Sequence, residues 1–213
     1  MTKSLEDRVR DAHATAADPA GTRDFYDGWA ADYDRDLLTS GTPYMAVCAG
    51  MVARHVADRD ARILDGGCGT GLIGQFLHWI GYNNIEGLDA SAGMLEAARA
   101  KGCYRALHEM FLAPGMDLAD ASFDAVVASG VLIAGHAPPD ALDGMVRVAK
   151  PGAPIVFNMN PKSLTEAGYG AKIDALSDAG AWTFVEESRV YPPYPFNPGV
   201  GHAKPRVLVF RKA

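Results

Sequence analysis

A run of closely spaced glycines bracketed by two aspartates is the part of the sequence with the clearest chemical meaning. Asp65 opens the run DGGCGTG, which ends at Gly71, and Asp89 closes the next apolar segment. Glycine lacks a Cβ and tolerates positive φ, so such a run lets a ligand approach the backbone closely. Between a strand and a helix the ligand is typically a nucleotide, and an acid after the next strand can bind its ribose hydroxyls. The pattern therefore predicts a site for an adenosine-type ligand.

Two classes of ligand fit this pattern, and the residues leave the alternatives open. Gly69-x-Gly71-x-x-Gly74 matches the dinucleotide fingerprint, in which a helix N-terminus binds a pyrophosphate, as in NAD(P)-dependent oxidoreductases. Asp65 favours a different ligand, because a carboxylate repels a pyrophosphate but attracts a cationic sulfonium or ammonium group. Asp89 serves either ligand. A non-catalytic protein that only binds an adenosine cofactor is a third alternative.

Two further groups of side chains could take part in chemistry. His136 follows an expected strand and could orient a substrate or accept its proton, since imidazole titrates near neutrality; a partly exposed histidine at a helix entry is the alternative. Tyr26, Trp29 and Tyr33 share one face of an expected helix, which either packs on the core or forms a lid over the ligand. The segment 191–194, YPPY, is interpreted as a turn.

The elements that must position these residues alternate between strand and helix. Expected strands lie at 63–65, 84–88, 103–108, 123–128 and 155–158, and expected helices at 72–80, 91–100, 138–148 and 163–178. Three helices precede them at 1–18, 24–38 and 43–57, the last capped by Thr42 with Pro43 at its first position. Two strands, 182–191 and 206–211, follow without a helix between them and should form an antiparallel hairpin.

This order predicts an α/β fold with a doubly wound, mostly parallel seven-stranded sheet of Rossmann type, a C-terminal antiparallel hairpin and an N-terminal helical cap. We expect a single domain over residues 1–213, with a cap or lid at 1–40 and the Rossmann-like core at 41–213.

Composition limits the possible partners. Lys and Arg number 20 against 26 Asp and Glu, a net charge of −6, and no Lys/Arg-rich run occurs, which argues against a nucleic-acid partner. The three cysteines form no CxxC pair, so neither a disulfide framework nor a metal site is expected. No apolar run approaches the ~20 residues of a membrane span, and we expect a soluble cytoplasmic protein. Nothing indicates an oligomeric state.

Four segments together resemble the class I S-adenosylmethionine-dependent methyltransferases: ILDGGCGTG (63–71), EGLDASAGML (86–95), SFDAVVASGVL (122–132) and RVAKPGAPIVF (147–157). More narrowly, YDGWAADYDRD (26–36) and GHAPPDALDGMVRVAKPG (135–152) resemble the small methyltransferases related to the Williams–Beuren-syndrome-region methyltransferase-like protein. Two positions depart from the family pattern: Ala153 replaces the second glycine usual after KPG, and Gly66 adds a glycine to the loop.

The resemblance implies methyl transfer from S-adenosyl-L-methionine to an unidentified, small-molecule acceptor, with a protein or RNA site as a less favoured acceptor. Residue by residue, it implies cofactor contacts at the methionine and ribose (Gly67, Cys68, Gly69, Gly71), the amino group (Asp65), the ribose hydroxyls (Asp89) and the adenine (Ala90, Met94, Glu109, Met110). Ser129 would border the sulfonium and the acceptor, and Tyr26 and Tyr33 would belong to the lid.

Overall fold

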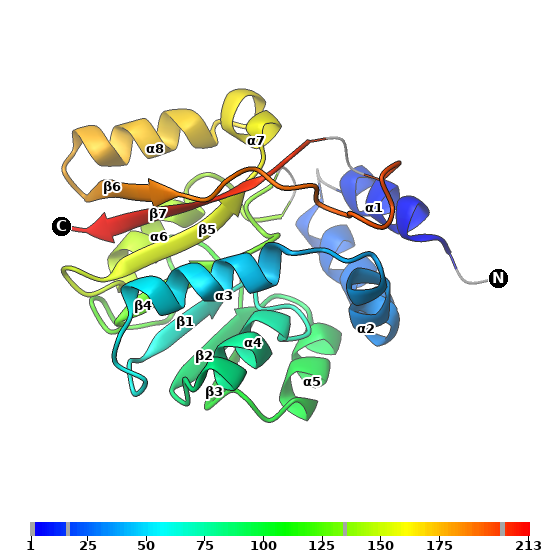
Figure 1. Ribbon diagram of the computed structural model, residues 1–213, viewed down its shortest axis with the longest axis horizontal. Coiled ribbons are helices and arrows are strands. Elements are labelled where there is room, and N and C mark those ends of the chain that lie inside the picture. Colours follow the sequence, from blue (N-terminus) through cyan, green and yellow to red (C-terminus); the bar gives the residue numbers. More distant parts are fainter. Residues whose placement is uncertain (1–2, 16–17, 134–135, 201–202) are drawn as a thin grey trace.

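The computed structural model describes residues 3–15, 18–133, 136–200 and 203–213, so parts of the expected helix at 1–18 and residue 135 lie outside the described ranges (Figure 1). Its centre is a seven-stranded sheet with the strand order β3-β2-β1-β4-β5-β7-β6. The strands are β1 (Ile63–Gly66), β2 (Ile85–Asp89), β3 (Ala106–Glu109), β4 (Ala125–Ala128), β5 (Pro154–Met159), β6 (Trp182–Glu187) and β7 (Arg206–Lys212). Strands β1 to β5 are parallel, whereas β7 runs antiparallel to both β5 and β6. The predicted mixed sheet and its terminal hairpin are therefore confirmed.

Two apolar cores lie on opposite faces of the sheet, because successive side chains of a strand point to opposite sides. Ile63 belongs to the core that includes residues of α3 (Tyr44–His55) and α4 (Leu72–Ile80). Leu64, the next residue, belongs to the core that includes residues of α6 (Ala141–Val148) and α8 (Tyr169–Asp178). The strands are thus covered on both faces, as expected of a doubly wound sheet. Among the described helices none is long and apolar enough to cross a membrane.

The N-terminal helices lie at the end of the sheet toward which β5 points (Figure 1). They are α1 (Leu5–Ala14) and α2 (Pro19–Thr39), and α2 contacts α5 (Ala92–Ala100). The loop between β6 and β7 also reaches α2, since the Phe196 N–H donates to the Ser40 carbonyl oxygen at 3.0 Å. The carboxyl ends of the parallel strands are therefore covered by segments from both ends of the chain.

Several predicted boundaries were wrong. No side chain caps α3, whose N-cap position is held by Pro43 and not by Thr42. The expected helix at 163–178 is two helices, α7 (Pro161–Glu166) and α8, because Gly168 between them has φ +81°, a left-handed conformation that interrupts a helix. The expected strand at 182–191 ends at Glu187, because the Val207 N–H of the neighbouring strand donates to the Ser188 hydroxyl oxygen and not to a backbone carbonyl.

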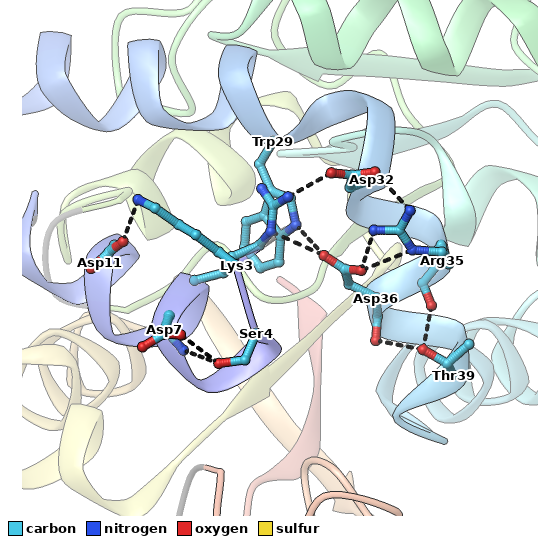
Figure 2. A network of polar contacts seen from close by, with 10 residues as sticks. Lys3, Ser4, Asp7, Asp11, Trp29, Asp32, Arg35, Asp36 and Thr39 are labelled. Carbon is cyan, nitrogen blue, oxygen red and sulfur yellow. Dashed lines mark hydrogen bonds and ion pairs between the residues drawn. The ribbon is translucent and has the colours of Figure 1, made fainter. Parts of the chain in front are cut away.

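A buried ion-pair network joins α1 to the outer face of α2 (Figure 2). The Arg8 guanidinium pairs with Asp32 at 2.5 Å and with Asp36 at 3.1 Å, and it lies 5.6 Å from the centre of the Trp29 ring. The Trp29 Nε1–H donates to Asp36 at 2.9 Å, and the Trp29 side chain is only 3% exposed. Trp29 therefore packs between helices, as the core interpretation of the aromatic face expects.

Substituting Arg8 by Met tests whether this network holds α1 in place. The change keeps most of the side-chain volume but leaves Asp32 and Asp36 paired only with the exposed Arg35, so we expect unfolding to become easier by ~2 kcal/mol. Arg10→Met is the matched control, because Arg10 is exposed and pairs only with the exposed Asp7 among the contacts described. Urea unfolding of both variants measures the difference. Equal effects would contradict a role for the Arg8 network.

Candidate functional site

A cavity with about 750 Å³ of empty space opens at the carboxyl ends of the parallel strands. Its walls come from α2, the glycine loop after β1, the end of β2, and the segments that follow β3 and β4. Its lining is mostly apolar and comprises Thr22, Arg23, Tyr26, Tyr33, Gly67, Gly69, Leu88, Asp89, Ala90, Ser91, Met94, Met110, Phe111, Leu112, Ser129, Gly130, Val131, His136 and Ala137.

The glycine loop presents its backbone to this cavity. Gly67 and Gly69 have φ of +72° and +54°, which favour glycine over any residue with a Cβ. A Cβ at Gly67 would lie 2.6 Å from the Val131 side chain, whereas a Cβ at Gly69 would meet nothing closer than the Met94 sulfur at 4.0 Å. The loop is tied to β2 by the Gly67 N–H, which donates to the Leu88 carbonyl oxygen at 2.8 Å. A ligand can therefore approach the backbone at Gly69 directly.

Asp89 stands at the carboxyl end of β2 with its carboxylate fixed on the cavity wall. One carboxylate oxygen accepts from the Gly69 N–H at 2.9 Å and the other from the Ser91 N–H at 2.9 Å. Burial raises the pKa of Asp89 above its ordinary value, although these N–H bonds oppose the rise. A carboxylate has about four acceptor sites, so each oxygen of Asp89 keeps capacity for a ligand hydroxyl.

Asp65 lies beneath the loop and outside the cavity lining. It is completely buried, and one of its oxygens accepts from the Tyr104 hydroxyl at 2.6 Å. The Tyr104 ring runs past Gly71 and Gly74, where an added Cβ would come within 2.8 and 2.2 Å of ring atoms. The third glycine of the dinucleotide fingerprint thus makes room for a tyrosine of the same chain. In this structure Asp65 anchors that tyrosine.

The burial of Asp65 predicts a measurable dependence of stability on pH. Burial raises the pKa of Asp65 from 3.8 to about 7, although the Tyr104 hydrogen bond opposes the rise. The folded protein therefore binds this proton more tightly than the unfolded chain does. The contribution of Asp65 to stability is fully present below pH 3.8 and is lost as the pH rises toward 7.

Asp65→Asn cannot titrate, so its stability relative to the wild type is expected to be ~2 kcal/mol more favourable at pH 8 than at pH 5. Urea unfolding of both proteins at the two pH values measures this difference. A constant difference across that range would show that Asp65 is ionised in the folded protein throughout.

Two aspartates of α2 hold this helix over the glycine loop. Asp27 accepts from the Ser91 hydroxyl at 2.5 Å and from the Gly93 N–H at 2.9 Å. Asp34 accepts from the Thr70 hydroxyl and pairs with Lys101, both at 2.5 Å. Because the two aspartates are seven residues apart, both lie along one side of the helix. These contacts fix α2 beside the loop and Asp89.

The side chains of Tyr26 and Tyr33, on the same helix, line the cavity, and Tyr26 also contacts the segment that follows β4. The Tyr26 hydroxyl lies 2.7 Å from His136 Nε2, on the segment that follows β4. The two tyrosine rings contact each other edge to face, with centroids 6.2 Å apart. The Trp29 ring contacts both tyrosine rings and also the Arg8 guanidinium of α1, whereas the two tyrosines line the cavity.

The structure brings most of the sequence-predicted residues together. The cavity lining includes Tyr26, Tyr33, Gly67, Gly69, Asp89, Ala90, Met94, Met110, Ser129 and His136. It does not include Asp65, Cys68, Gly71 or Glu109; Cys68 is buried, Gly71 begins α4, and Glu109 is exposed. Among the described residues no cluster of acidic, histidine and cysteine side chains could hold a metal ion.

Sequence reasoning missed several lining residues. Thr22 and Arg23 lie on the first turns of α2, and Phe111 and Leu112 follow β3. Phe111 is 49% exposed at the cavity, and an aromatic residue two positions beyond the end of a strand was the only available signal for it.

A doubly wound sheet with an acid at the end of β2 and a Cβ-free loop after β1 has the architecture of proteins that bind an adenosine cofactor. Residues 64–157 match a family described as a methyltransferase domain. Human methyltransferase-like protein 27 is 36% identical over 181 residues, covering 82% of this chain and 73% of that protein. A demethylmenaquinone methyltransferase of Clavibacter sepedonicus is 32% identical over 187 residues, covering 80% of this chain and 75% of that protein.

Solved structures agree in fold. The magnesium protoporphyrin IX methyltransferase of Synechocystis, solved with bound S-adenosylhomocysteine, superposes with a TM-score of 0.66 at 16% identity, covering 92% of this chain and all of that chain. A possible histamine N-methyltransferase of Thermotoga maritima superposes with a TM-score of 0.63 at 18% identity, covering 88% and 98%. The chain belongs to the class I S-adenosylmethionine-dependent methyltransferases, and S-adenosylmethionine is its cofactor. The oxidoreductase alternative is not favoured.

Proposed function

We propose that the cavity binds S-adenosylmethionine together with a small-molecule acceptor, and that the methyl group passes between them there. When bound, the cofactor supplies an electrophilic methyl group on a sulfonium. Gly67 and Gly69 would hold its amino-acid and ribose portion, and Asp89 would accept its ribose hydroxyls. Ala90, Met94 and Met110 would contact the adenine, with Ser129 toward the acceptor and Tyr26 and Tyr33 covering the site.

The observation that carries this proposal is the fixed carboxylate of Asp89 beside an open stretch of backbone. Its two oxygens are held by the Gly69 and Ser91 N–H groups, so the carboxylate is oriented before a ligand arrives. A Cβ at Gly67 would collide with Val131, and the space beside Gly69 is open. Oriented acceptors next to accessible backbone suit the ribose of an adenosine cofactor. The residues present therefore fit the cofactor.

The remaining lining supports a small acceptor. Phe111, Leu112 and Val131 are apolar, and Arg23 is the single Lys or Arg among the described lining residues. Arg23 itself pairs with Asp24 at 3.2 Å. A polynucleotide acceptor would require clustered positive charge. The relative from Clavibacter sepedonicus is likewise named for a small molecule, demethylmenaquinone.

The same geometry supports a division of the chain into a cap and a core. We assign residues 1–40 as a cap, because α2 lines the cavity, α1 packs on α2 and neither adds a strand to the sheet, and residues 41–213 as the core. The three cysteines are all buried and unpaired, which supports a reducing compartment such as the cytoplasm.

A labelling experiment tests the class of acceptor. The protein and S-adenosylmethionine with a tritiated methyl group are incubated with separate low-mass, protein and nucleic-acid fractions of a cell extract, and unreacted S-adenosylmethionine is then removed by chromatography. We expect label in a compound of the low-mass fraction other than S-adenosylmethionine, and mass spectrometry to show that this compound is a methylated product. The Asp89→Asn variant serves as the control for cofactor dependence. Label confined to protein or RNA would contradict the small-molecule assignment.

A further inference from the structure

Tyr26 and His136 form a hydrogen-bonded pair on the wall of the cavity. Tyr26 comes from α2 and His136 from the segment after β4, and the phenol oxygen lies 2.7 Å from His136 Nε2. Both residues line the cavity together with Ser129 and Gly130, which follow β4. Burial raises the pKa of the Tyr26 hydroxyl, so this group keeps its proton at neutral pH and can donate it to the imidazole.

A phenol bonded to an imidazole can pass a proton in two linked steps, since the phenol oxygen accepts one proton as it donates its own. We infer that Tyr26 is a catalytic residue that takes the proton of an aromatic hydroxyl acceptor, with His136 behind it as the final proton acceptor. This inference rests on the proposed function and narrows its acceptor to a class of substrate. It also places Tyr26 between His136 and the acceptor, so that His136 acts on the acceptor through Tyr26.

The transfer balances as follows. The acceptor hydroxyl gives its proton to Tyr26 Oη while the Tyr26 proton moves to His136 Nε2. The acceptor oxygen uses the freed electron pair to form the new C–O bond, and the pair of the broken S–C bond stays on sulfur. The products are a methyl ether, S-adenosylhomocysteine and a protonated His136, which then releases its proton to water.

The chemistry of the pair selects the class of acceptor. A neutral amine already has a free electron pair, and a carboxylic acid is ionised at neutral pH, so neither needs a proton acceptor before it attacks the methyl group. A phenol, with a pKa near 10, does need one. The apolar walls of Phe111, Leu112 and Val131 and the ring of Tyr26 suit a flat aromatic body.

Four variants test the relay: Tyr26→Phe, His136→Gln, the double variant, and Tyr82→Phe as a control. His136→Gln keeps an acceptor for the Tyr26 hydrogen bond but cannot take up the proton. Tyr82→Phe removes another buried phenol hydroxyl, which donates to the Val56 carbonyl oxygen. Tyr82 lies before the start of β2 and does not line the cavity. The acceptor probes are 4-methylphenol, 4-nitrophenol and 4-methylaniline, each with S-adenosylmethionine, and calorimetry with S-adenosylhomocysteine reports cofactor binding separately.

The relay predicts methylation of both phenols by the wild type and faster transfer to 4-methylphenol than to 4-methylaniline. Tyr26→Phe and His136→Gln should each lower kcat for 4-methylphenol by ~10²-fold, and the double variant should lose no more than either alone. For 4-nitrophenol, which ionises without help near neutral pH, the loss should stay below ~3-fold. Affinity for S-adenosylhomocysteine should stay within ~2-fold in all variants, and Tyr82→Phe should retain wild-type kcat.

Three results would overturn the relay: equal losses for both phenols, 4-methylaniline as the better acceptor, or no methylation of either phenol by wild-type protein that binds S-adenosylhomocysteine. Failure of the wild-type protein to bind S-adenosylhomocysteine would instead overturn the proposed function itself.

Discussion

Replacing Gly74 by alanine is expected to destabilise the folded protein by about 3 kcal/mol. A Cβ at this position would lie 2.2 Å from Cζ and 2.3 Å from the hydroxyl oxygen of Tyr104. Tyr104 cannot move aside freely, because its hydroxyl donates to the buried Asp65 at 2.6 Å and an added Cβ at Gly71 or Gly87 would also lie within 3.0 Å of its ring. Chemical unfolding of the variant gives the change in free energy.

The effect of Gly74→Ala on stability should change sign when the Tyr104 ring is removed. In a Tyr104→Val background the three atoms nearest to the added Cβ are gone, and alanine then only improves the helix propensity of α4. We expect Gly74→Ala to stabilise that background by ~1 kcal/mol relative to Tyr104→Val alone. An equal loss in both backgrounds would mean that Gly74 is needed for a reason other than Tyr104, such as contact with a ligand.

Asp89→Asn is expected to weaken the binding of S-adenosylhomocysteine by ~10²-fold, the equivalent of ~2.7 kcal/mol. The substitution removes the charge from the two hydrogen bonds that we propose Asp89 accepts from the ribose hydroxyls, each worth ~1.5 kcal/mol. It also places an amide NH₂ against one of the two N–H groups that now bind the carboxylate, those of Gly69 and Ser91. Calorimetric titration measures the affinity, and thermal unfolding without ligand shows whether the loop still folds.

Glu109→Gln is the matched control for that variant. Glu109 is the last residue of β3 and pairs in register with Asp89, the last residue of the neighbouring strand β2. Its side chain is exposed and does not line the cavity. We expect its affinity for S-adenosylhomocysteine to match that of the wild type. A comparable loss in both variants would show that negative charge at this edge, and not the position of Asp89, determines binding.

Local signals were enough to predict the fold. Strands β1, β2 and β4 are short, mainly apolar runs that end near a glycine or an acid, as at Asp65 and Asp89, and the alternation of strands with helices determines a doubly wound sheet. The absence of a helix between the last two runs predicted the hairpin. What local signals did not show is that β7 lies between β5 and β6, because strand order depends on packing between distant segments.

The candidate site was most predictable at the strand ends, because the carboxyl ends of neighbouring parallel strands share one edge of the sheet. Gly67, Gly69 and Asp89 lie where strand ends must meet, and the structure brings them to one cavity. Asp65 belongs to the same pattern, yet it is buried beneath the loop with Tyr104. That tyrosine lies well beyond Asp65 in the sequence, and the fold is needed to bring the two together. The direction of a side chain at a strand end is decided by such tertiary contacts.

Contacts between distant segments account for the other features of the site that were not predicted. Tyr26 and His136 are separated by most of the core, and nothing in either local sequence indicates that their side chains meet. The surroundings of the aromatic face likewise depend on α1, whose Arg8 lies against the Trp29 ring while Tyr26 and Tyr33 line the cavity. Helical spacing placed the three aromatic residues on one face but could not say which element each would touch.

Calorimetric titration of the wild-type protein with S-adenosylhomocysteine and, separately, with NAD tests the central claim most directly. We expect S-adenosylhomocysteine to bind with a dissociation constant on the order of micromolar, about −8 kcal/mol. We expect NAD to give no heat of binding, because Tyr104 fills the space beside Gly74 and the Gly67 and Gly69 N–H groups already donate to Leu88 and Asp89. Binding of NAD with no response to S-adenosylhomocysteine would contradict the assignment of the cavity.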